Sequence, residues 1–550
     1  MTNAISALLH DIGKFYQRTG IWPDLTKFKK YLVFRNGKYL YYHAAYTGSF
    51  INTYIGNKKI EFLAASHHLP KESIIKNADI IASAHDRRDS DYDDSHDENY
   101  ILMRLSSIFH LIGEDFHNMI VPLVDLSSFT AFKKAEELSI KQAKKEYFDL
   151  FMNFVYNIKK ISNKNLNLFY HHLYPLVKEY LYCIPANTYK VDKCFVSLFD
   201  HLKLTTAVVN CLKQTKEKQQ FAIIKYHLHG ITDFVYCDDD LDLIYGRSAF
   251  IKLLEDFIVY RIIHEFGLTY DNILYAMGGQ GRIIVPNNQT LIKKLNHVYD
   301  IIIKKVNIRQ VGIINFVLSY DIYDENNLKS GKFKRALSEN EKNLIKFKKF
   351  VDKGINKVDY YSIGKKIINN NIIIEYNFGK KNHNISDISF LGLGYINFNP
   401  RKEDDICYYQ TYNGFNIGES KNYKIVRNYQ LDNNAVLILM DIVDTANIIT
   451  NKINKNAQSF STFLTLSRTI ELFFTRIVSD LCLKMPVNII YTSGDDIVLI
   501  TSSINKDVVI KTIIDGFDEF TSFNQAFKWK VIIEPINDEI SQVYKKIKNK

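Results

Sequence analysis

The stretch NIIYTSGDDIVLI, Asn488–Ile500, consists of two apolar runs separated by a short polar turn. Apolar runs of this kind, rich in β-branched residues and joined through a turn that contains glycine, predict a β-hairpin. Two adjacent carboxylates, Asp495 and Asp496, occupy the turn. Because a hairpin turn does not need paired negative charge, these aspartates require a chemical explanation.

The hairpin ends a pattern that occurs twice in the chain. Each copy has an apolar strand, a long helix and a hairpin, with the sequences FAIIKYHLHGI, GRSAFIKLLEDFIVYRIIHEFG and NILYAMGGQGRIIVP in the first copy and AVLILMDIV, FSTFLTLSRTIELFFTRIVSDLC and VNIIYTSGDDIVLITS in the second. A repeated unit of this type predicts two related α+β domains of ferredoxin-like character. Only the second copy carries the acids, since Gly279 and Gln280 align with Asp495 and Asp496.

A third acid, Asp441, ends the first strand of the second copy. We expect this strand to lie beside the hairpin, so that three carboxylates meet in an oxygen site suited to Mg²⁺ or Mn²⁺ with a bound triphosphate. The alternative is that Asp495 and Asp496 only shape a solvated turn. We favour the metal site because the first copy forms its turn without acids. Asp444 is expected on the strand face opposite Asp441.

A second group of metal-binding residue types lies near the N-terminus. The sequence LLHDIGKF places His10 and Asp11 side by side on a predicted first helix, with Asn3 as its N-cap. Two further predicted helices add other candidate ligands, namely His67 and His68 in AASHHLP and Asp79 in NADIIASAHDRR. Histidine and carboxylate ligands from separate helices are typical of sites for divalent transition ions, which activate water for phosphodiester hydrolysis.

Two points about these histidines stay open at the level of sequence. His43, in YYHAAYTGSF, is either a metal ligand or a buried core histidine. One of His67 and His68 is expected to serve in packing or to support a ligand. Because neighbouring helix positions diverge by about 100°, His10 and Asp11 are expected either to bridge two metals or to supply only one ligand between them.

Composition sets broad limits on the protein. A chain of 550 residues is long enough for several domains. Its 71 basic residues exceed its 60 acidic ones, which weakly favours a polyanionic partner such as nucleic acid or a nucleotide. The cysteines show no CxxC pair, so neither a disulfide framework nor a zinc site is predicted. Because no leader and no membrane-spanning run is recognisable, we expect a soluble, cytoplasmic protein without a membrane partner.

Several motifs, taken in order, resemble one family. ALLHDIGKFYQR, HAAYTGSF, SHHLP and NADIIASAHDRR resemble a permuted HD nuclease domain. HGITDF and YGRSAF resemble the family's first palm domain, and SGDD with the helix LTLSRTIELFF resembles its second. Together these motifs resemble the large signature subunit of type III CRISPR interference complexes, closest to the Csm, or III-A, branch.

The resemblance implies a multidomain α+β fold in which an N-terminal all-α HD domain precedes two ferredoxin-like palm domains. The implied parts are an HD domain (residues 1–130), a helical linker region (131–215), a first, non-catalytic palm (216–320), an intervening basic α+β domain without a zinc ribbon (321–430) and a second palm with the SGDD hairpin (431–550).

The resemblance also implies two activities that target RNA switches on: metal-dependent cleavage of single-stranded DNA and synthesis of cyclic oligoadenylates from ATP. The implied partners are crRNA, target RNA and other Csm subunits. Mn, Ni or Co is expected at the HD site, Mg or Mn at the palm, and no zinc. The implied catalytic residues are His10, Asp11, Asp441, Asp495 and Asp496. Metal ligands are expected among these together with His43, His67, His68 and Asp79, and nucleotide contacts at Ser493, Gly494, Asp495, Gly278 and Gly279.

This sequence departs from the family pattern in two respects. Ser493 stands where the family has the first glycine of a Gly-Gly-Asp-Asp turn, and its Cβ occupies space near the nucleotide. Only 54 residues (550 minus 496) follow Asp496, which predicts a compact member without the family's C-terminal helical domain. Two alternatives are therefore kept: a scaffold subunit with one or both sites decayed, and a free-standing HD phosphohydrolase that acts on nucleotides.

Overall fold

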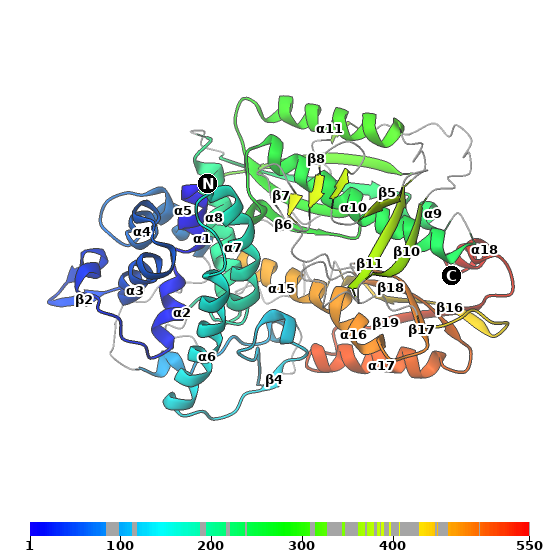
Figure 1. The fold of residues 1–550 in the computed structure, drawn as a ribbon, viewed down its shortest axis with the longest axis horizontal. Helices are drawn as coiled ribbons and strands as arrows, with labels where there is room; N and C mark the ends of the chain where they lie inside the picture. Colours follow the sequence, from blue (N-terminus) through cyan, green and yellow to red (C-terminus); the bar gives the residue numbers. More distant parts are fainter. Residues whose placement is uncertain are drawn as a thin grey trace.

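Figure 1 shows a computed structural model of the chain, with helices at one end and two sheet domains at the other. The structure describes residues 1–83, 98–112, 118–187, 194–215, 220–236, 239–308, 314–326, 344–346, 361–368, 371–378, 382–384, 387–389, 395–397, 406–407, 428–445, 448, 460–493 and 495–548. Within these ranges, every helix is too short or too polar to cross a membrane.

The N-terminal region is mainly helical, as predicted, with two small hairpins added to it. Its α-helices are α1 (Thr2–Leu8), α2 (Ile12–Arg18), α3 (Tyr42–Phe50), α4 (Lys58–Ala65), α5 (Ile74–Ser83), α6 (Ile140–Ile158), α7 (Leu166–Leu181) and α8 (Leu198–Leu212). Its strands are β1 (Val33–Arg35), β2 (Lys38–Leu40), β3 (Met119–Ile120) and β4 (Lys133–Lys134), and its other helical turns are η1 (Thr26–Tyr31), η2 (Ile51–Ile55), η3 (Glu98–Ile101), η4 (Ile108–Leu111) and η5 (Leu126–Ser128).

Helix α8 is buried on nearly all sides and packs against α1 and α5. Ser197 caps its N-terminus by accepting a hydrogen bond from the N–H of Asp200. Ala7 of α1, Ala78 of α5 and Ala207 of α8 are fully buried in one hydrophobic cluster, and small residues of this kind let helices approach closely. The region 131–215, which the sequence predicts as a helical linker, therefore contributes a helix that packs against the N-terminal helices α1 and α5.

The two palm domains have the same topology, which confirms the predicted repeat. The first comprises β5 (Phe221–His229), α9 (Ile231–Val235), α10 (Leu241–Glu265), η6 (Tyr270–Asn272), β6 (Ile273–Met277), β7 (Gln280–Pro286), α11 (Leu291–Ile308), β8 (Asn315–Tyr323) and β9 (Leu344–Lys346). The second comprises β16 (Ala435–Ile442), α15 (Phe460–Leu472), η9 (Phe473–Ile477), α16 (Val478–Cys482), β17 (Val487–Ser493), β18 (Asp496–Ser502), α17 (Lys506–Phe520), β19 (Trp529–Pro535) and α18 (Ile540–Lys548). Their strand orders are β6-β7-β5-β8-β9 and β17-β18-β16-β19.

The repeat extends to an irregularity in each hairpin. The register of β6 with β7 shifts between Ile273 and Tyr275, and that of β17 with β18 shifts between Ile489 and Tyr491. Because bulges are positional features of a fold rather than random defects, their match supports the alignment of the two turns. Elsewhere, small sheets contain β10 (Tyr361–Ile368), β11 (Asn371–Phe378), β12 (Asn382–Asn384), β13 (Asp387–Ser389), β14 (Tyr395–Asn397) and β15 (Ile406–Cys407).

One hydrophobic core runs through both palms. Ile224 and Val285 of the first palm belong to the same buried cluster as Leu437 and Ile500 of the second. Helix α15 of the second palm lies between the palms and the helical region, where it contacts α8 and β6 (Figure 1). Burial of side chains from both palms in one core implies that they stabilise one another.

Candidate metal centres

The His10–Asp11 dipeptide lies in a break between two helices. Helix α1 ends at Leu8 and α2 begins at Ile12. The prediction of one continuous helix with its N-cap at Asn3 is therefore wrong, because α1 already includes Asn3 and ends before His10. The break frees the two side chains from the divergence that a helix imposes on neighbours, so His10 Nε2 lies 3.6 Å from Asp11 Oδ2.

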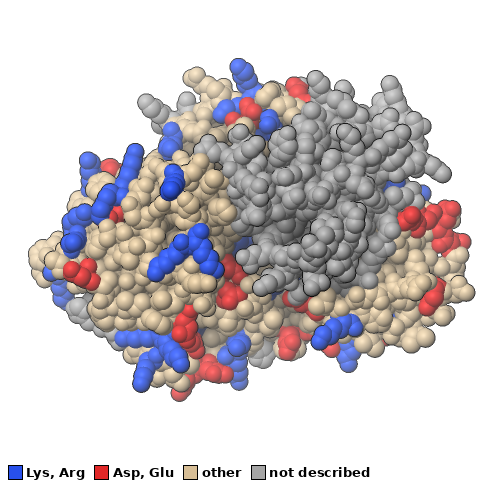
Figure 2. Space-filling model, in the orientation of Figure 1, with Lys and Arg blue, Asp and Glu red and all other residues tan. Residues whose placement is uncertain are grey.

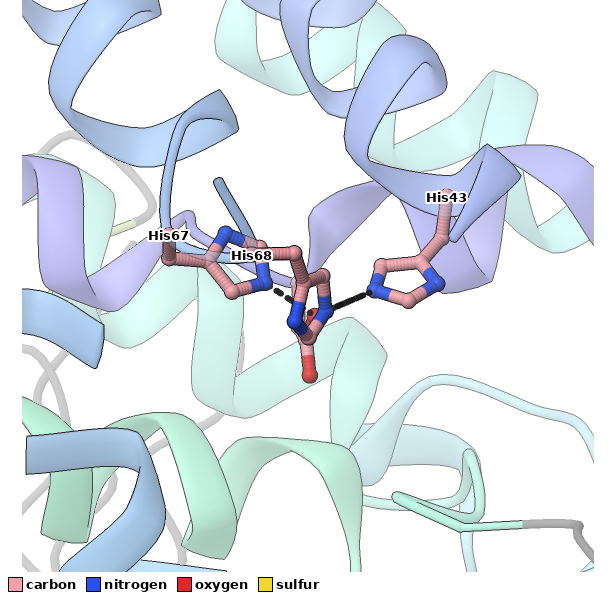
Figure 3. Close-up of side chains that lie close together, drawn as sticks. His43, His67 and His68 are labelled. Atoms are coloured by element: carbon pink, nitrogen blue, oxygen red, sulfur yellow. Dashed lines mark hydrogen bonds and ion pairs between the residues drawn. The ribbon is translucent and has the colours of Figure 1, made fainter. Parts of the chain in front are cut away.

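Three more histidines converge on Asp11 from other segments. The Nε2 atoms of His43, at the start of α3, and of His67, after α4, each lie 3.4 Å from Asp11 Oδ1. His68 Nε2 lies 2.8 Å from His43 Nε2. Figure 3 shows the imidazoles of His43, His67 and His68 turned toward a common point. One potential ligand atom from each of these residues and from Asp11 lies within 4.8 Å of all the others, so both His67 and His68 are placed to bind.

A second set of ligand atoms shares Asp11. His201 Nε2 lies 3.5 Å from Asp11 Oδ2 and 3.2 Å from Asp79 Oδ1, and His10 Nε2 lies 3.8 Å from the same Asp79 oxygen. Together with the first set, these residues form what we call the HD centre: His10, Asp11, His43, His67, His68, Asp79 and His201. An aspartate shared between two sets of ligands is an arrangement that can bridge two metal ions.

His201 is a member that the sequence reading missed. It belongs to α8, far along the chain from the other ligands and inside the segment read as a linker. A signal was present, because SLFDHLKLTTAVV places an adjacent Asp and His in a largely apolar helix. Buried ionisable side chains on such a helix favour a site over a solvated surface.

The histidines are oriented for metal binding. The Nδ1 atoms of His10 and His67 hydrogen bond to the carbonyls of Ala7 and Ala64 at 2.8 and 2.7 Å. Donation from Nδ1 fixes the tautomer that leaves Nε2 as a lone-pair donor. The buried Nε2 atoms of His10 and His67 make no hydrogen bond of good geometry. Buried lone pairs without hydrogen bonds, facing a carboxylate, fit a divalent transition ion.

Electrostatics also favour neutral histidines at most of the centre. Burial lowers the pKa of His10, lowers that of His43 to about 3 and holds that of His68 well below its usual range. For His201, burial is outweighed by Asp11 and Asp79, and its pKa is raised. Neutral imidazole is the form that binds metal, so little deprotonation would be needed at His10, His43 and His68.

Lys14, one helical turn after Asp11, is a further residue that the sequence reading did not single out. Its Nζ lies 2.6 Å from Asp11 Oδ2 and donates to the carbonyl of Ala186 at 3.0 Å. Burial alone would raise the pKa of Asp11, but Lys14 and His10 outweigh it and hold this pKa well below its usual range. Asp11 is therefore ionised, as a metal ligand must be.

The second centre lies where the hairpin of the second palm meets its central strand. Asp441 on β16 is paired directly with Asp496 on β18, and the N–H of Ile442 donates to the carbonyl of Asp495 at 3.3 Å. One oxygen from each of Asp441, Asp495 and Asp496 lies within 4.8 Å of the other two. We call this triad the palm centre. The predicted meeting of three carboxylates is confirmed.

Asp444 differs from the expectation. The strand ends at Ile442, and Asp444 lies in the following turn with a φ of 61°. The argument from opposite strand faces therefore does not apply to Asp444.

The palm centre concentrates negative charge in a partly buried place. Burial raises the pKa of Asp495, with a further contribution from Asp441, against a hydrogen bond from Thr445. Burial raises the pKa of Asp496 to about 8, with Asp495 and Asp441 adding to the rise. A cation would relieve this repulsion, so hard carboxylate oxygens at this spacing fit Mg²⁺ or Mn²⁺.

The turns carry the other residues expected to contact nucleotide. Ser493 ends β17 opposite Asp496, and Gly494 lies outside the described residues. In the first palm, Gly278 and Gly279 have φ values of 68° and 77°, as a two-residue hairpin turn requires. The N–H of Gly279 donates to Glu255 at 3.0 Å.

The fold and these centres define a class of protein that joins an HD-type metal centre to paired ferredoxin-like palms. A family profile described as Csm1 subunit domain B matches residues 220–357. Two curated relatives are named CRISPR system single-strand-specific deoxyribonuclease Cas10/Csm1 (subtype III-A). The one from Methanocaldococcus jannaschii is 28% identical over 356 residues, which cover 53% of this chain and 42% of that protein. The one from Streptococcus thermophilus is 23% identical over 333 residues, which cover 52% and 40%.

Solved structures show the same fold. A Csm1–Csm4 cassette in complex with one ATP matches with a TM-score of 0.70 and 15% identity, over 100% of this chain and 82% of that one. The Csm1–Csm4 subcomplex of the type III-A CRISPR-Csm interference complex matches with a TM-score of 0.69 at 15% identity and the same coverage. The chain spans about two fifths of the length of the curated relatives above. These matches identify it as a relative of the Cas10/Csm1 large subunit of subtype III-A.

Proposed function

We propose that this protein is the large subunit of a cytoplasmic type III-A CRISPR complex, in which the HD centre cleaves single-stranded DNA and the palm centre makes cyclic oligoadenylates from ATP. Its partners in the proposal are crRNA, target RNA and other Csm subunits. The observation that carries the proposal is the convergence of histidines from separate helices on Asp11, in a relative of named single-strand-specific deoxyribonucleases. The domain boundaries stated from the sequence are part of this proposal.

At the HD centre, the chain holds ligand atoms in place and supplies positive charge. His10, His43, His67, His68, His201, Asp11 and Asp79 would hold one or two ions of Mn, Ni or Co. A divalent ion bound here supplies Lewis acidity and a nucleophilic water. Lys14, held against Asp11 and Ala186, adds a cation where a phosphodiester would develop negative charge.

At the palm centre, Asp441, Asp495 and Asp496 would hold Mg²⁺ or Mn²⁺ against the triphosphate of ATP. An ion bound here neutralises charge on the phosphates and activates the attacking 3′ hydroxyl. The turn residues Ser493, Gly494, Gly278 and Gly279 are proposed to border the nucleotide. Tyr544 of α18 stacks on Tyr236 with ring centroids 3.8 Å apart, and burial and then Asp496 raise its pKa to about 12.

The nuclease assignment is tested by incubating a labelled single-stranded DNA with the full chain and Mn²⁺. His10→Ala with Asp11→Ala is expected to abolish cleavage, since it removes atoms from both ligand sets. Asp441→Asn is the matched control, because it alters the other centre, and it is expected to leave cleavage intact. Cleavage that survives the His10 and Asp11 change would reject the assignment.

The cyclase assignment requires the assembled complex. The protein is combined with guide RNA and partner subunits, and target RNA, ATP and Mg²⁺ or Mn²⁺ are added. Oligoadenylates are expected by mass spectrometry, and they are expected to disappear in Asp495→Ala with Asp496→Ala. If a complex that binds target RNA makes none, the palm centre is not a working cyclase, and the scaffold alternative holds for this domain.

A further inference from the structure

A small exposed hairpin immediately precedes the helix that carries His43. Strands β1 and β2 are joined by Asn36 and Gly37, which have φ values of 51° and 76°. Positive φ at both positions is characteristic of the type I′ turn, which suits the twist of a tight hairpin. All residues from Phe34 to Tyr39 are exposed. In Figure 1, β2 lies at the outer end of the helical region.

The hairpin presents aromatic rings to solvent. Phe34 and Tyr39 face each other across the strands, with ring centroids 5.0 Å apart. Their exposed fractions are 63% and 40%. Large aromatic side chains grouped on a surface in this way indicate a binding site rather than a core.

Basic residues are frequent in the segment that carries these rings. Residues 20–42 contain five Lys and Arg residues and one acid, Asp24. Lys27, Lys29, Arg35 and Lys38 are exposed, whereas Lys30 pairs with Glu61 at 3.7 Å. Figure 2 shows several Lys and Arg side chains, with a few Asp and Glu side chains among them, at the end of the molecule where β2 lies in Figure 1. The surface is therefore complementary to a polyanion.

The hairpin also leads to the HD centre. Tyr41, directly after β2, stacks on His68 with ring centroids 3.9 Å apart and planes 17° apart. His43 follows two residues later, and its Nε2 lies 3.4 Å from Asp11 Oδ1. Tyr39 and His43 are four positions apart in the chain, which limits the distance between their backbones to about 14 Å. The solvent-exposed ring of Tyr39 is therefore only a few residues along the chain from the candidate ligand His43.

We propose that the β1–β2 hairpin is a binding platform for single-stranded DNA, on which bases stack against Phe34 and Tyr39 while Lys and Arg contact the backbone. Alternating rings and cations are the usual means of holding single strands without sequence preference. The proposal rests on the proposed function for the choice of DNA as ligand. A protein partner is the competing occupant, but the excess of Lys and Arg around the rings favours nucleic acid.

The test measures binding without cleavage. A fluorescein-labelled oligo-dT is titrated with the full chain in EDTA, and anisotropy is recorded. Phe34→Ala with Tyr39→Ala is expected to weaken binding by about tenfold or more, because each stack is lost. The matched control is Phe148→Ala with Tyr156→Ala on α6. The exposed fractions of Phe148 and Tyr156, 40% and 65%, are close to those of the hairpin pair. The control is expected to stay within about twofold of wild type.

Further measurements distinguish DNA binding at the hairpin from damage to the HD centre and from binding of a protein partner. Arg35→Glu with Lys38→Glu is expected to weaken binding and to flatten its dependence on salt. Mn²⁺ is expected to raise the melting temperature of the Phe34 and Tyr39 variant as it does that of wild type, which shows that the HD centre is intact. Equal oligo-dT affinity in the hairpin and control variants overturns the proposal. If the hairpin variant keeps its oligo-dT affinity but no longer binds a protein partner, the proposal is also overturned, and the hairpin is a protein-binding site.

The platform proposal and the nuclease proposal can be rejected independently of each other. His10→Ala with Asp11→Ala is expected to bind oligo-dT like wild type. If wild type does not cleave DNA but binding still depends on Phe34 and Tyr39, the platform stands and the nuclease proposal fails. If wild type cleaves and binding ignores the hairpin, only the platform is rejected.

Discussion

At the scale of single residues, the palm centre holds like charges close together. Asp441 and Asp496 are direct partners across β16 and β18, and Asp495 precedes Asp496 in the turn. The raised pKa of Asp496, about 8, follows from burial and from these two neighbours. In the unfolded chain the carboxylates separate and ionise freely, so this centre lowers the stability of the metal-free protein above about pH 4.

Asp496→Asn is accordingly expected to stabilise the metal-free protein. Removing one carboxylate relieves repulsion, and the free energy of unfolding at pH 8 should rise by about 1–3 kcal/mol. The same change should abolish the rise in melting temperature that Mg²⁺ causes. Denaturant unfolding and melting with and without Mg²⁺ measure both effects. Asp444→Asn, in the neighbouring turn, is the control; a loss of stability in Asp496→Asn would contradict this account.

A second prediction concerns the buried Asp271, which no proposed activity uses. Burial raises its pKa to about 7, although Tyr170 and Thr269 donate hydrogen bonds to it at 2.6 and 2.8 Å. A raised carboxyl pKa means that the folded state keeps a proton that the unfolded state has lost. Stability should fall as pH rises from about 4 to 7, by about 4 kcal/mol in total.

Asp271→Asn should remove that part of the pH dependence. Its free energy of unfolding relative to wild type should therefore increase between pH 5 and pH 8, as measured by denaturant midpoints at both values. Parallel pH profiles for the two proteins would show that Asp271 is ionised in the fold.

At the scale of elements, a single glycine sets the contact between α2 and α3. A Cβ on Gly13 would lie 1.9 Å from the carbonyl oxygen of His43 and 2.6 Å from the N–H nitrogen of Thr47. The N–H of Gly13 donates to Thr47 Oγ1, which in turn donates to the carbonyl of His10. The glycine therefore fixes His43 and the His10–Asp11 break relative to each other.

Gly13→Ala is expected to push α3 away and to damage the HD centre. The backbone atoms that it meets cannot move aside without shifting a helix, so the free energy of unfolding should fall by about 3 kcal/mol. The rise in melting temperature with Mn²⁺ should shrink or vanish. Gln17→Ala, on the same helix and only partly buried, is the control. An unchanged Mn²⁺ response in Gly13→Ala would exclude this role of the glycine.

Most elements of the palms could be predicted because their sequence patterns are local. The strand and hairpin of the second palm end within a residue or so of the apolar runs that predict them. The π-helical stretch η9 was not predicted, because 3.6-residue periodicity cannot reveal one extra residue in a turn. The break after Leu8 was missed for a similar reason, since nothing in LLHDIG interrupts a helical pattern.

The candidate sites were predictable only in part. Asp441 could be joined to Asp495 and Asp496 because sheet topology brings neighbouring strands together. His43 and both His67 and His68 could be named as candidates from their motifs, but their geometry could not. His201 could have been named as a candidate from the Asp-His pair in its helix, but its place beside Asp11 and Asp79 could not, because that depends on the packing of α8 against α1 and α5.

At the scale of the whole molecule, α8 connects the HD centre with the second palm. His201 faces the HD centre, whereas the preceding residue, Asp200, faces α15. Arg468 of α15 donates to Asp200 through Nε at 3.1 Å and Nη2 at 2.8 Å, and Thr465 donates at 2.8 Å. This buried network ties the backbone that carries His201 to the helix that follows the Asp441 strand.

Arg468→Met is expected to weaken both folding and the HD centre. It leaves Asp200 buried without its cation, which should cost about 3–5 kcal/mol, and it should reduce the rise in melting temperature with Mn²⁺. Adding Asp200→Asn should restore much of both. Arg476→Met, which breaks contacts of the same helical run with the carbonyls of Leu126 and Phe129, is the control. It should lower stability while the Mn²⁺ response stays normal; equal Mn²⁺ responses in both variants would contradict the coupling.

Because Asp200 and His201 are adjacent, one helix contacts both the HD centre and the second palm. Thermodynamic linkage then constrains how binding at one centre changes affinity at the other. Whatever factor nucleotide binding at the palm applies to metal affinity at the HD centre, metal binding must apply in return to nucleotide affinity. A signal that travels through α8 is thus reciprocal at equilibrium. One-way control, in which only one reaction governs the other, would have to arise in the rates of the chemical steps.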